Sequence, residues 1–160
     1  MDDLVAQAHQ VVVALVAHGQ TVAACESLTG GLAAAALTSV PGSSATVRGA
    51  LVTYATELKT TLAGVDEQLV ARDGVVSESV ARAMAEGCRV RLGSSIGMSC
   101  TGVAGPGPQD GAPAGTVWIA VAGRNGTTAR RLSLTGDREA VRRGTVAALF
   151  DEVLQLLRGV

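Results

Sequence analysis

A serine stands at a predicted junction between a strand and a helix. Residues 20–25 have the apolar character of a short buried strand, and residues 32–39 have the composition of a helix. Ser27 lies between them and is followed closely by Gly30 and Gly31. Such a junction presents backbone N–H groups that can hold an anion, or an oxygen that becomes negative during a reaction. The alternative interpretation is a serine that only caps the helix.

Three further groups of polar residues could meet this serine. Tyr54 and Lys59 follow a second predicted strand, and the glycine-rich segment 101–107 follows a third. The last predicted helix opens with Arg138, Arg142 and Arg143. Sites in α/β proteins form at the carboxyl ends of parallel strands, where these groups are expected to converge. Each group also has an ordinary explanation, as an exposed hydroxyl, a solvated helix cation or a turn.

The histidines and cysteines narrow the possible chemistry. His9 and His18 both lie in the first predicted helix and point in opposite directions, so neither a zinc site nor a Ser–His–Asp triad is expected. The three cysteines lack paired spacing, which argues against disulfides and thiolate metal sites. Cys25 precedes Ser27 by two residues, on the same face of a strand, and is therefore an alternative nucleophile.

The elements that must position these residues follow from periodicity and turn signals. Helices are expected over residues 3–18, 29–39, 57–62, 77–92 and 137–157, with a further helical turn at 66–70. Strands are expected over residues 20–26, 47–54, 95–100, 115–122 and 128–134. Asn125 and Gly126 form a hairpin turn between the last two strands. The pattern predicts one α/β domain over residues 1–160, a three-layer α/β/α sandwich with a mixed, mostly parallel sheet of about five strands.

Composition excludes several classes of protein. Apolar residues make up 48% of the 160 residues but aromatic residues only 2%, so the core must be built from alanine, valine and leucine. So few rings disfavour a binder of single-stranded nucleic acid, and a net charge of −1 offers no footprint for DNA. No apolar run approaches the ~20 residues of a membrane span, and a secretion signal is not expected. A cytoplasmic location is expected.

Five motifs in a fixed order resemble a known family. They are CESLTGG at residues 25–31, VTYATELK at 52–59, GVVSE at 74–78, CTGVAGPG at 100–107 and GTVWI at 115–119. Together they resemble the CinA C-terminal domain family, the nicotinamide-nucleotide amidases also called PncC, over about residues 4–157. The family often carries an additional N-terminal domain similar to molybdopterin-binding proteins, and this chain resembles the stand-alone form.

The resemblance implies hydrolysis of the carboxamide of nicotinamide mononucleotide to nicotinate mononucleotide and ammonia. It implies Ser27 as the nucleophile, paired with Tyr54 and Lys59. The chain departs from the family pattern at Leu28, where small or thiol side chains are common, and at Thr56, where asparagine is frequent. Residues 107–113 also hold fewer glycines than usual. These departures bear on substrate fit.

The implied chemistry makes demands on the site. A free lysine has a pKa of about 10.4, so holding Lys59 neutral at pH 7 without a shift would cost roughly 4.6 kcal/mol, and burial must lower its pKa. Lys59 would take the serine proton directly or through Tyr54. The residues expected to contact the substrate are Leu28, Thr29, Gly30, Gly31, Thr101, Gly102, Gly105 and Arg142. Backbone N–H groups of 28–31 would hold the oxyanion, and Arg142 or segment 101–107 the phosphate. No metal or cofactor is required.

Two other functions remain open from the sequence. One is a non-catalytic module that senses a pyridine nucleotide. The other is a partner-binding protein in competence or DNA repair, which the family's name suggests. The expected partners are a nucleotide of low molecular weight and, from the apolar residues at 11–13 and 154–157, a second copy of the chain in a homo-oligomer, most simply a dimer. Direct contact with nucleic acid or membrane is not expected.

Overall fold

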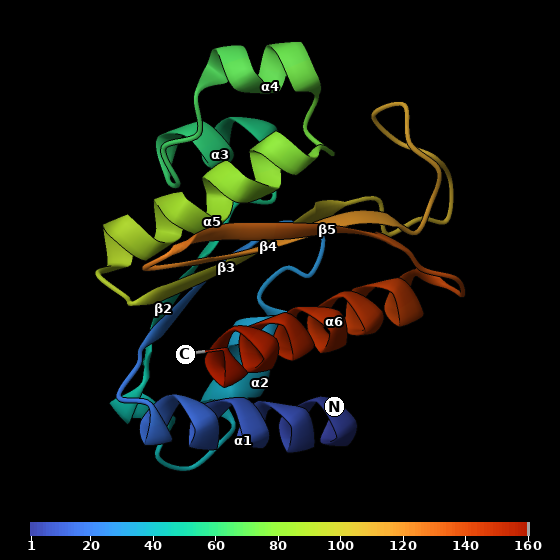
Figure 1. Cartoon of the computed structure of the whole chain (residues 1–160). Helices are drawn as coiled ribbons and strands as arrows, with labels where there is room; N and C mark the ends of the chain where they lie inside the picture. The colour runs from blue at the N-terminus through green and yellow to red at the C-terminus, as the bar shows by residue number, and fades with distance from the viewer. Residues whose placement is uncertain (160) are drawn as a thin grey trace.

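A five-stranded mixed sheet in the order β2-β1-β3-β4-β5 crosses the centre of the computed structural model, which describes residues 1–159 (Figure 1). The strands are β1 (Val22–Glu26), β2 (Val47–Val52), β3 (Ile96–Gly102), β4 (Thr116–Gly123) and β5 (Gly126–Ser133). β1 pairs in parallel with β2 and β3, whereas β4 pairs antiparallel with β3 and β5. Only β4 therefore runs against the common direction, and the predicted mixed, mostly parallel sheet is confirmed.

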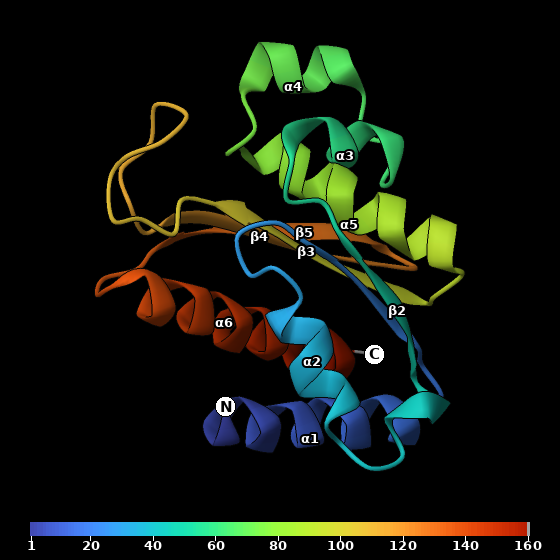
Figure 2. The same ribbon diagram turned by 180° about the vertical axis from the view of Figure 1, so that it is seen from behind.

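Helices cover both faces of the sheet. One face carries α1 (Asp2–Ala17), α2 (Leu32–Thr38) and α6 (Arg138–Arg158), and the other carries α3 (Thr56–Thr61), α4 (Glu67–Asp73) and α5 (Glu78–Leu92) (Figures 1 and 2). A short 3₁₀ helix at Ser43–Ala45 precedes β2. This is the three-layer α/β/α arrangement that the alternation of elements predicts.

Local signals set the ends of the long helices. The side chain of Ser77 accepts a hydrogen bond from Val80 N at the start of α5, and the side chain of Asp137 accepts one from Ala140 N at the start of α6. Gly93 ends α5 with a φ of 63°. The caps expected at Ser77 and Asp137 are thus confirmed. The cap at Asp137 fixes the start of α6 at Arg138.

Small residues let the layers approach closely. A Cβ atom on Gly87 would lie 1.8 Å from the carbonyl oxygen of Ala63, and one on Gly97 would lie 2.0 Å from that of Ala85. These glycines let α5 pack against β3 and against the segment after α3. The core is accordingly built from alanine, valine and leucine, with Phe150 as its one fully buried ring.

Several boundaries differ from the prediction. α2 begins at Leu32 instead of residue 29, because Gly30 and Gly31 have φ values of 59° and 102° and hold residues 27–31 in a turn. β2 ends at Val52 instead of residue 54, although Thr53 N still donates to the carbonyl oxygen of Glu26 at 2.8 Å. α4 is a full helix where only one helical turn is expected.

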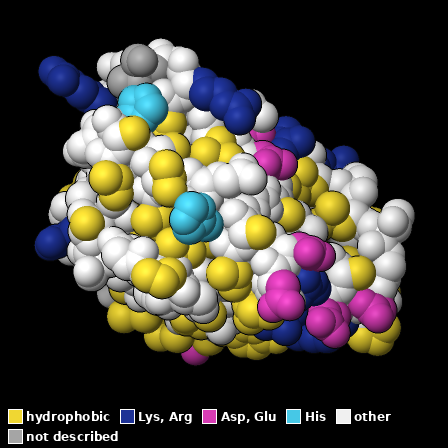
Figure 3. Space-filling model, turned by 90° about the horizontal axis from the view of Figure 1, so that it is seen from below, with side chains coloured by type: hydrophobic (Ala, Val, Ile, Leu, Met, Phe, Trp, Pro, Cys, Tyr) yellow, Lys and Arg dark blue, Asp and Glu magenta, His cyan; other side chains and the backbone are white. Residues whose placement is uncertain are grey.

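The outer face of the α1 layer mixes apolar, charged and histidine side chains (Figure 3). Both histidines are exposed. Val11, Val12 and Leu157 belong to the chain's own core, whereas Val13 is exposed. Most of the apolar residues that suggested a homo-oligomer are therefore used within this domain. No helix within residues 1–159 is long and apolar enough to cross a membrane.

Candidate active site

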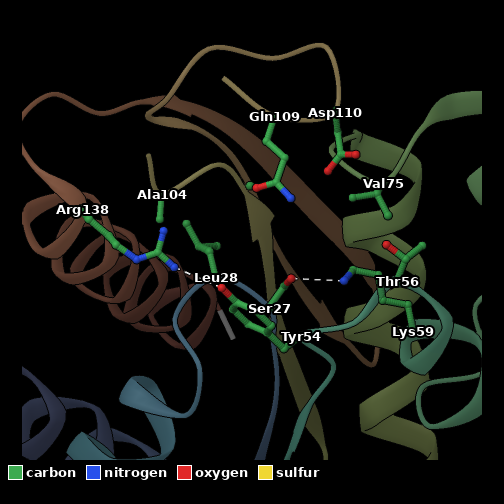
Figure 4. A pocket seen from close by; sticks show the side chains of 11 residues that line it. Ser27, Leu28, Tyr54, Thr56, Lys59, Val75, Ala104, Gln109, Asp110 and Arg138 are labelled. Atoms are coloured by element: carbon green, nitrogen blue, oxygen red, sulfur yellow. Dashed lines mark hydrogen bonds between the residues drawn. The ribbon is translucent and has the colours of Figure 1, made fainter. Parts of the chain in front are cut away.

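A pocket opens at the carboxyl ends of the three parallel strands β2, β1 and β3 (Figure 4). It is lined by Ser27, Leu28, Tyr54, Thr56, Lys59, Val75, Gly102, Ala104, Gln109, Asp110 and Arg138. Ser27 follows β1, Tyr54 follows β2, and Gly102 ends β3. The expectation that these segments share one edge of the sheet is met, because parallel neighbours end side by side.

Ser27 and Lys59 are in direct contact in this pocket. The Nζ atom of Lys59 donates to Ser27 Oγ at 3.1 Å and to the carbonyl oxygen of Thr53 at 2.8 Å. Lys59 is only 1% exposed and Ser27 only 8% exposed. The lysine comes from α3 and the carbonyl from the connection between β2 and α3, so the backbone aims the amine at the hydroxyl.

Burial lowers the pKa of Lys59 below its ordinary value. Nearby negative groups oppose that shift, namely the thiols of Cys25 and Cys100 when ionised and the carboxylates of Asp110 and Glu57. Burial also raises the pKa of Cys25 to about 11 and that of Cys100 to about 12, so both thiols are protonated at neutral pH. Only the two carboxylates then oppose the shift, and the buried amine is biased toward its neutral form.

Cys25 is poorly placed as a nucleophile. Its side chain is fully buried in a cluster with Val80, Met84 and Cys88, and it does not line the pocket. Its sulfur contacts Thr53 Oγ1 at 3.6 Å. The raised pKa leaves almost no thiolate at neutral pH, and the thiolate is the reactive form. The geometry therefore favours Ser27 over the alternative nucleophile.

Glu26, which the sequence suggested only as a possible helper of Cys25, has a structural role that was not predicted. Its buried carboxylate accepts from Thr29 Oγ1 at 2.5 Å and from the backbone N–H groups of Gly31 and Ala33 at 3.1 Å each, and its second oxygen accepts from Ala34 N at 2.8 Å. The N-terminus of α2 is thus occupied by the protein's own carboxylate. A glutamate inside an otherwise apolar strand was the available signal, because such a buried charge needs several partners.

This carboxylate changes the expected anion site. The N–H of Gly30 is bonded to Ser27 O and that of Gly31 to Glu26, so neither is free to bind substrate. Within residues 1–159, no acceptor engages the N–H groups of Leu28 and Thr29. Of the four N–H groups expected to hold an oxyanion, the two without an internal acceptor therefore belong to the turn and not to the helix end.

Tyr54 and Arg138 form the mouth of the pocket. Tyr54 is 60% exposed, and its hydroxyl accepts from Arg138 Nη2 at 3.0 Å. Arg138 also donates from Nη1 to the carbonyl oxygen of Gly105 at 2.7 Å. Tyr54 lines the same pocket as Ser27 and Lys59, but no hydrogen bond within the described chain joins its hydroxyl to either residue. The buried pair is thus Ser27 and Lys59, with Tyr54 nearer the solvent.

The remaining residues expected at the substrate divide into two groups. Leu28 and Gly102 line the pocket. Arg142 does not, because its guanidinium donates to the carbonyl oxygens of Leu28 at 3.1 Å and Thr29 at 2.9 Å. Thr101 is buried and donates to the carbonyl oxygen of Val75 at 2.9 Å. Arg142 and Thr101 hold the walls of the pocket in place.

The fold and site define an α/β domain with a buried serine–lysine pair at the carboxyl edge of its sheet. Residues 5–157 match the family described as CinA C-terminal domain, and the chain belongs to that family. Among residues 1–159, no cluster of three or more histidine, cysteine, aspartate or glutamate side chains is arranged to hold a metal ion.

Relatives and solved structures agree with this assignment. A CinA-like protein of Frankia casuarinae is 49% identical over 91% of the chain, and a putative competence-damage inducible protein of Desulforamulus reducens is 43% identical over 91%. The alignments cover 34% and 35% of those proteins, so the chain spans about a third of their length. A CinA superfamily protein of Klebsiella pneumoniae superposes with a TM-score of 0.94 at 33% identity, covering 98% of this chain and 99% of that one. The corresponding Escherichia coli structure gives 0.92 at 30% identity, covering 96% and 90%.

Proposed function

We propose that this domain hydrolyses the carboxamide of nicotinamide mononucleotide, releasing nicotinate mononucleotide and ammonia. The observation that carries the proposal is the buried contact of 3.1 Å between Lys59 Nζ and Ser27 Oγ. A hydroxyl becomes a nucleophile when an adjacent base can remove its proton, and a neutral lysine is such a base. The resemblance of five motifs to the nicotinamide-nucleotide amidases supplies the substrate.

The first step forms a tetrahedral intermediate on Ser27, and the acyl-enzyme follows when the C–N bond breaks. The neutral Lys59 amine keeps one N–H on the Thr53 carbonyl and turns its lone pair to Ser27 Oγ. Ser27 Oγ attacks the carboxamide carbon while its proton passes to Lys59 Nζ. Lys59 acts directly, since its amine and not the phenol of Tyr54 contacts the serine.

The second step expels ammonia. The tetrahedral oxyanion accepts hydrogen bonds from the N–H groups of Leu28 and Thr29. The Lys59 ammonium returns its proton to the amide nitrogen, the C–N bond breaks, and ammonia leaves with both bonding electrons. Because the same amine has just received that proton, no second acid is required.

The third step regenerates the enzyme. A water molecule attacks the acyl carbon, and Lys59 takes a proton from it. The ester bond to Ser27 Oγ then breaks, and Lys59 returns the proton to the serine. The products are the carboxylic acid and an enzyme in its starting protonation state.

Arg138 is better placed than Arg142 to hold the 5′-phosphate. Arg138 lines the pocket, and its acceptors are the Gly105 carbonyl and the Tyr54 hydroxyl, both neutral. A phosphate is a stronger partner for a guanidinium than either neutral group. Arg142 is committed to the carbonyl groups of the turn after Ser27, where it positions the oxyanion donors.

The proposal is tested by a chromatographic assay of nicotinamide mononucleotide with simultaneous measurement of ammonia. We expect Ser27→Ala and Lys59→Met to lose activity by a factor on the order of 10³ or more, and Cys25→Ala to stay within a few-fold of the wild type. Loss of activity in Cys25→Ala alone would show that Cys25, and not Ser27, is the nucleophile. Tight binding of the nucleotide without ammonia release would contradict the amidase proposal and favour a non-catalytic sensor of the nucleotide.

A further inference from the structure

One carboxylate in the pocket has no part in the proposed reaction. Asp110 is the only acidic side chain among the residues that line the pocket. Figure 4 shows it hanging, with Gln109, from the loop above Ser27 and Lys59, while Arg138 enters from the opposite side. The pocket therefore carries a negative group on one side and a permanent positive group on the other.

The backbone fixes the position of Asp110. Gln109 and Ala112 exchange two backbone hydrogen bonds of 3.0 Å, which close a two-residue turn around Asp110 and Gly111. These two residues have φ values of 52° and 76°, the left-handed pair that defines a type I′ turn. A tight hairpin of this kind holds its side chains in defined directions, unlike an open loop of the same length.

The Asp110 carboxylate has no partner of its own. No hydrogen bond or ion pair within residues 1–159 engages its oxygens. Its charge also opposes the proposed reaction, because it raises the pKa of Lys59 and so favours the inactive ammonium form. Asp110 is exposed to solvent, so the turn and not burial holds it at the pocket. A carboxylate that lines the pocket, lacks a partner and disfavours the neutral base suits a cationic ligand better than a neutral one.

We propose that Asp110 makes the pocket selective for carboxamides on a positively charged ring. This inference rests on the proposed amidase function and defines its substrate class. N1-substituted nicotinamides are pyridinium cations, whereas free nicotinamide is neutral at pH 7. A nucleotide of nicotinamide carries a positive ring and a negative phosphate, and Asp110 and Arg138 provide the complementary charges on opposite sides of the pocket.

The test compares three substrates in the wild type and in Asp110→Asn. Nicotinamide mononucleotide has the cationic ring and the phosphate, 1-methylnicotinamide has the cationic ring alone, and nicotinamide has neither. Asparagine followed by glycine is a preferred type I′ pair, so this substitution removes the charge and keeps the turn. Values of kcat/KM are measured by ammonia release, and dissociation constants are measured in parallel by calorimetry.

We expect Asp110→Asn to lower both kcat/KM and binding affinity for the two cationic compounds on the order of 10-fold, relative to the same quantities for nicotinamide. The comparison between substrates cancels any change in Lys59 that affects all of them equally. The matched control is Asp151→Asn, which also removes one negative charge. Asp151 lies in α6 away from the pocket and accepts a hydrogen bond from Gln7 that asparagine can still accept. This control should leave all three ratios unchanged.

The outcomes separate this inference from the proposed function. Equal changes for charged and neutral compounds, or tighter binding of the cations by Asp110→Asn, would overturn the role of Asp110 while the amidase proposal stands. If the wild type releases ammonia from none of the compounds, the amidase proposal fails. The calorimetric ratios then still decide whether Asp110 selects a cationic ring.

Discussion

Lys59 and Ser27 are separated by 32 positions in the chain, yet the amine lies 3.1 Å from the hydroxyl with both side chains almost fully buried. The amine has the backbone carbonyl of Thr53 as its second acceptor, and no carboxylate within residues 1–159 forms a hydrogen bond or ion pair with it. A lysine in such surroundings loses the solvation that stabilises its charge. In the proposed reaction, Lys59 takes the place of the histidine that a Ser–His–Asp triad would use.

The pH dependence of activity follows from the pKa of Lys59. Its pKa is lowered from the ordinary value of 10.5, and the base is active only when neutral, so kcat should rise with pH and reach half its maximum below 10.5. The pH–rate profile of nicotinamide mononucleotide deamidation measures this limb. A half-maximum at or above the ordinary lysine value, or a flat profile, would contradict lysine as the base.

Asp110 should shift the same limb. Its carboxylate raises the pKa of Lys59, while Glu57 acts in the same direction from α3 and the protonated thiols of Cys25 and Cys100 contribute little at neutral pH. Removal of the Asp110 charge should therefore move the half-maximum of kcat in Asp110→Asn to lower pH. The pH profile of the Asp151→Asn control should coincide with that of the wild type. A shift to higher pH in Asp110→Asn would show that the carboxylate acts in another way.

Lys59→Met should abolish activity and at the same time stabilise the fold. A buried amine with a lowered pKa binds its proton more weakly in the folded state than in the unfolded chain, so its contribution to stability rises with pH. The thioether side chain has no such cost, and we expect the free energy of unfolding to rise by about 1 kcal/mol near neutral pH. Denaturant titrations at two pH values provide the check, with a smaller gain expected at the higher pH. A loss of stability at both would argue against a solvation cost at this position.

Glu26→Gln should have the opposite effect on stability. The buried carboxylate accepts four hydrogen bonds at the start of α2, and an amide places an NH₂ group against donors on one side. Loss of charge-assisted hydrogen bonds of this kind costs about 2 kcal/mol, which corresponds to a fall in Tm of about 4–8 °C for a chain of this length. Thermal unfolding by circular dichroism measures it. An unchanged Tm would mean that the carboxylate is not needed to close the helix.

Substitutions of Arg138 and Arg142 should affect different kinetic constants. Arg138→Gln should raise KM for nicotinamide mononucleotide about 10-fold or more, with little change for 1-methylnicotinamide, because only the nucleotide carries a phosphate. Arg142→Gln should lower kcat for both compounds, since it releases the carbonyl groups of Leu28 and Thr29 that hold the oxyanion donors in place. A rise in KM for the nucleotide in Arg142→Gln, and not in Arg138→Gln, would show that Arg142 binds the phosphate.

Local patterns in the sequence determined the order of the elements, the caps at Ser77 and Asp137 and the hairpin between β4 and β5, because these features depend on residues close together in the chain. The turn of that hairpin lies at Arg124 and Asn125, one residue before the predicted Asn125 and Gly126, because Gly126 already pairs with Gly123. The alternation of helices and strands also predicted that the segments after β1, β2 and β3 lie at one edge of the sheet, as they do. The resemblance of spaced motifs to a known family implied that Ser27, Tyr54 and Lys59 act together.

Only the tertiary structure decided which groups meet. It fills the start of α2 with Glu26, commits Arg142 to the turn after Ser27, brings Arg138 to the mouth and holds Asp110 over the pocket. The spacing of residues along the chain does not predict these contacts. A hydrogen bond between residues that are distant in sequence depends on how the layers pack and on which donors and acceptors that packing brings together. The burial that lowers the pKa of Lys59 has the same origin, since it arises from surrounding atoms of several elements and not from the neighbours of the lysine in sequence.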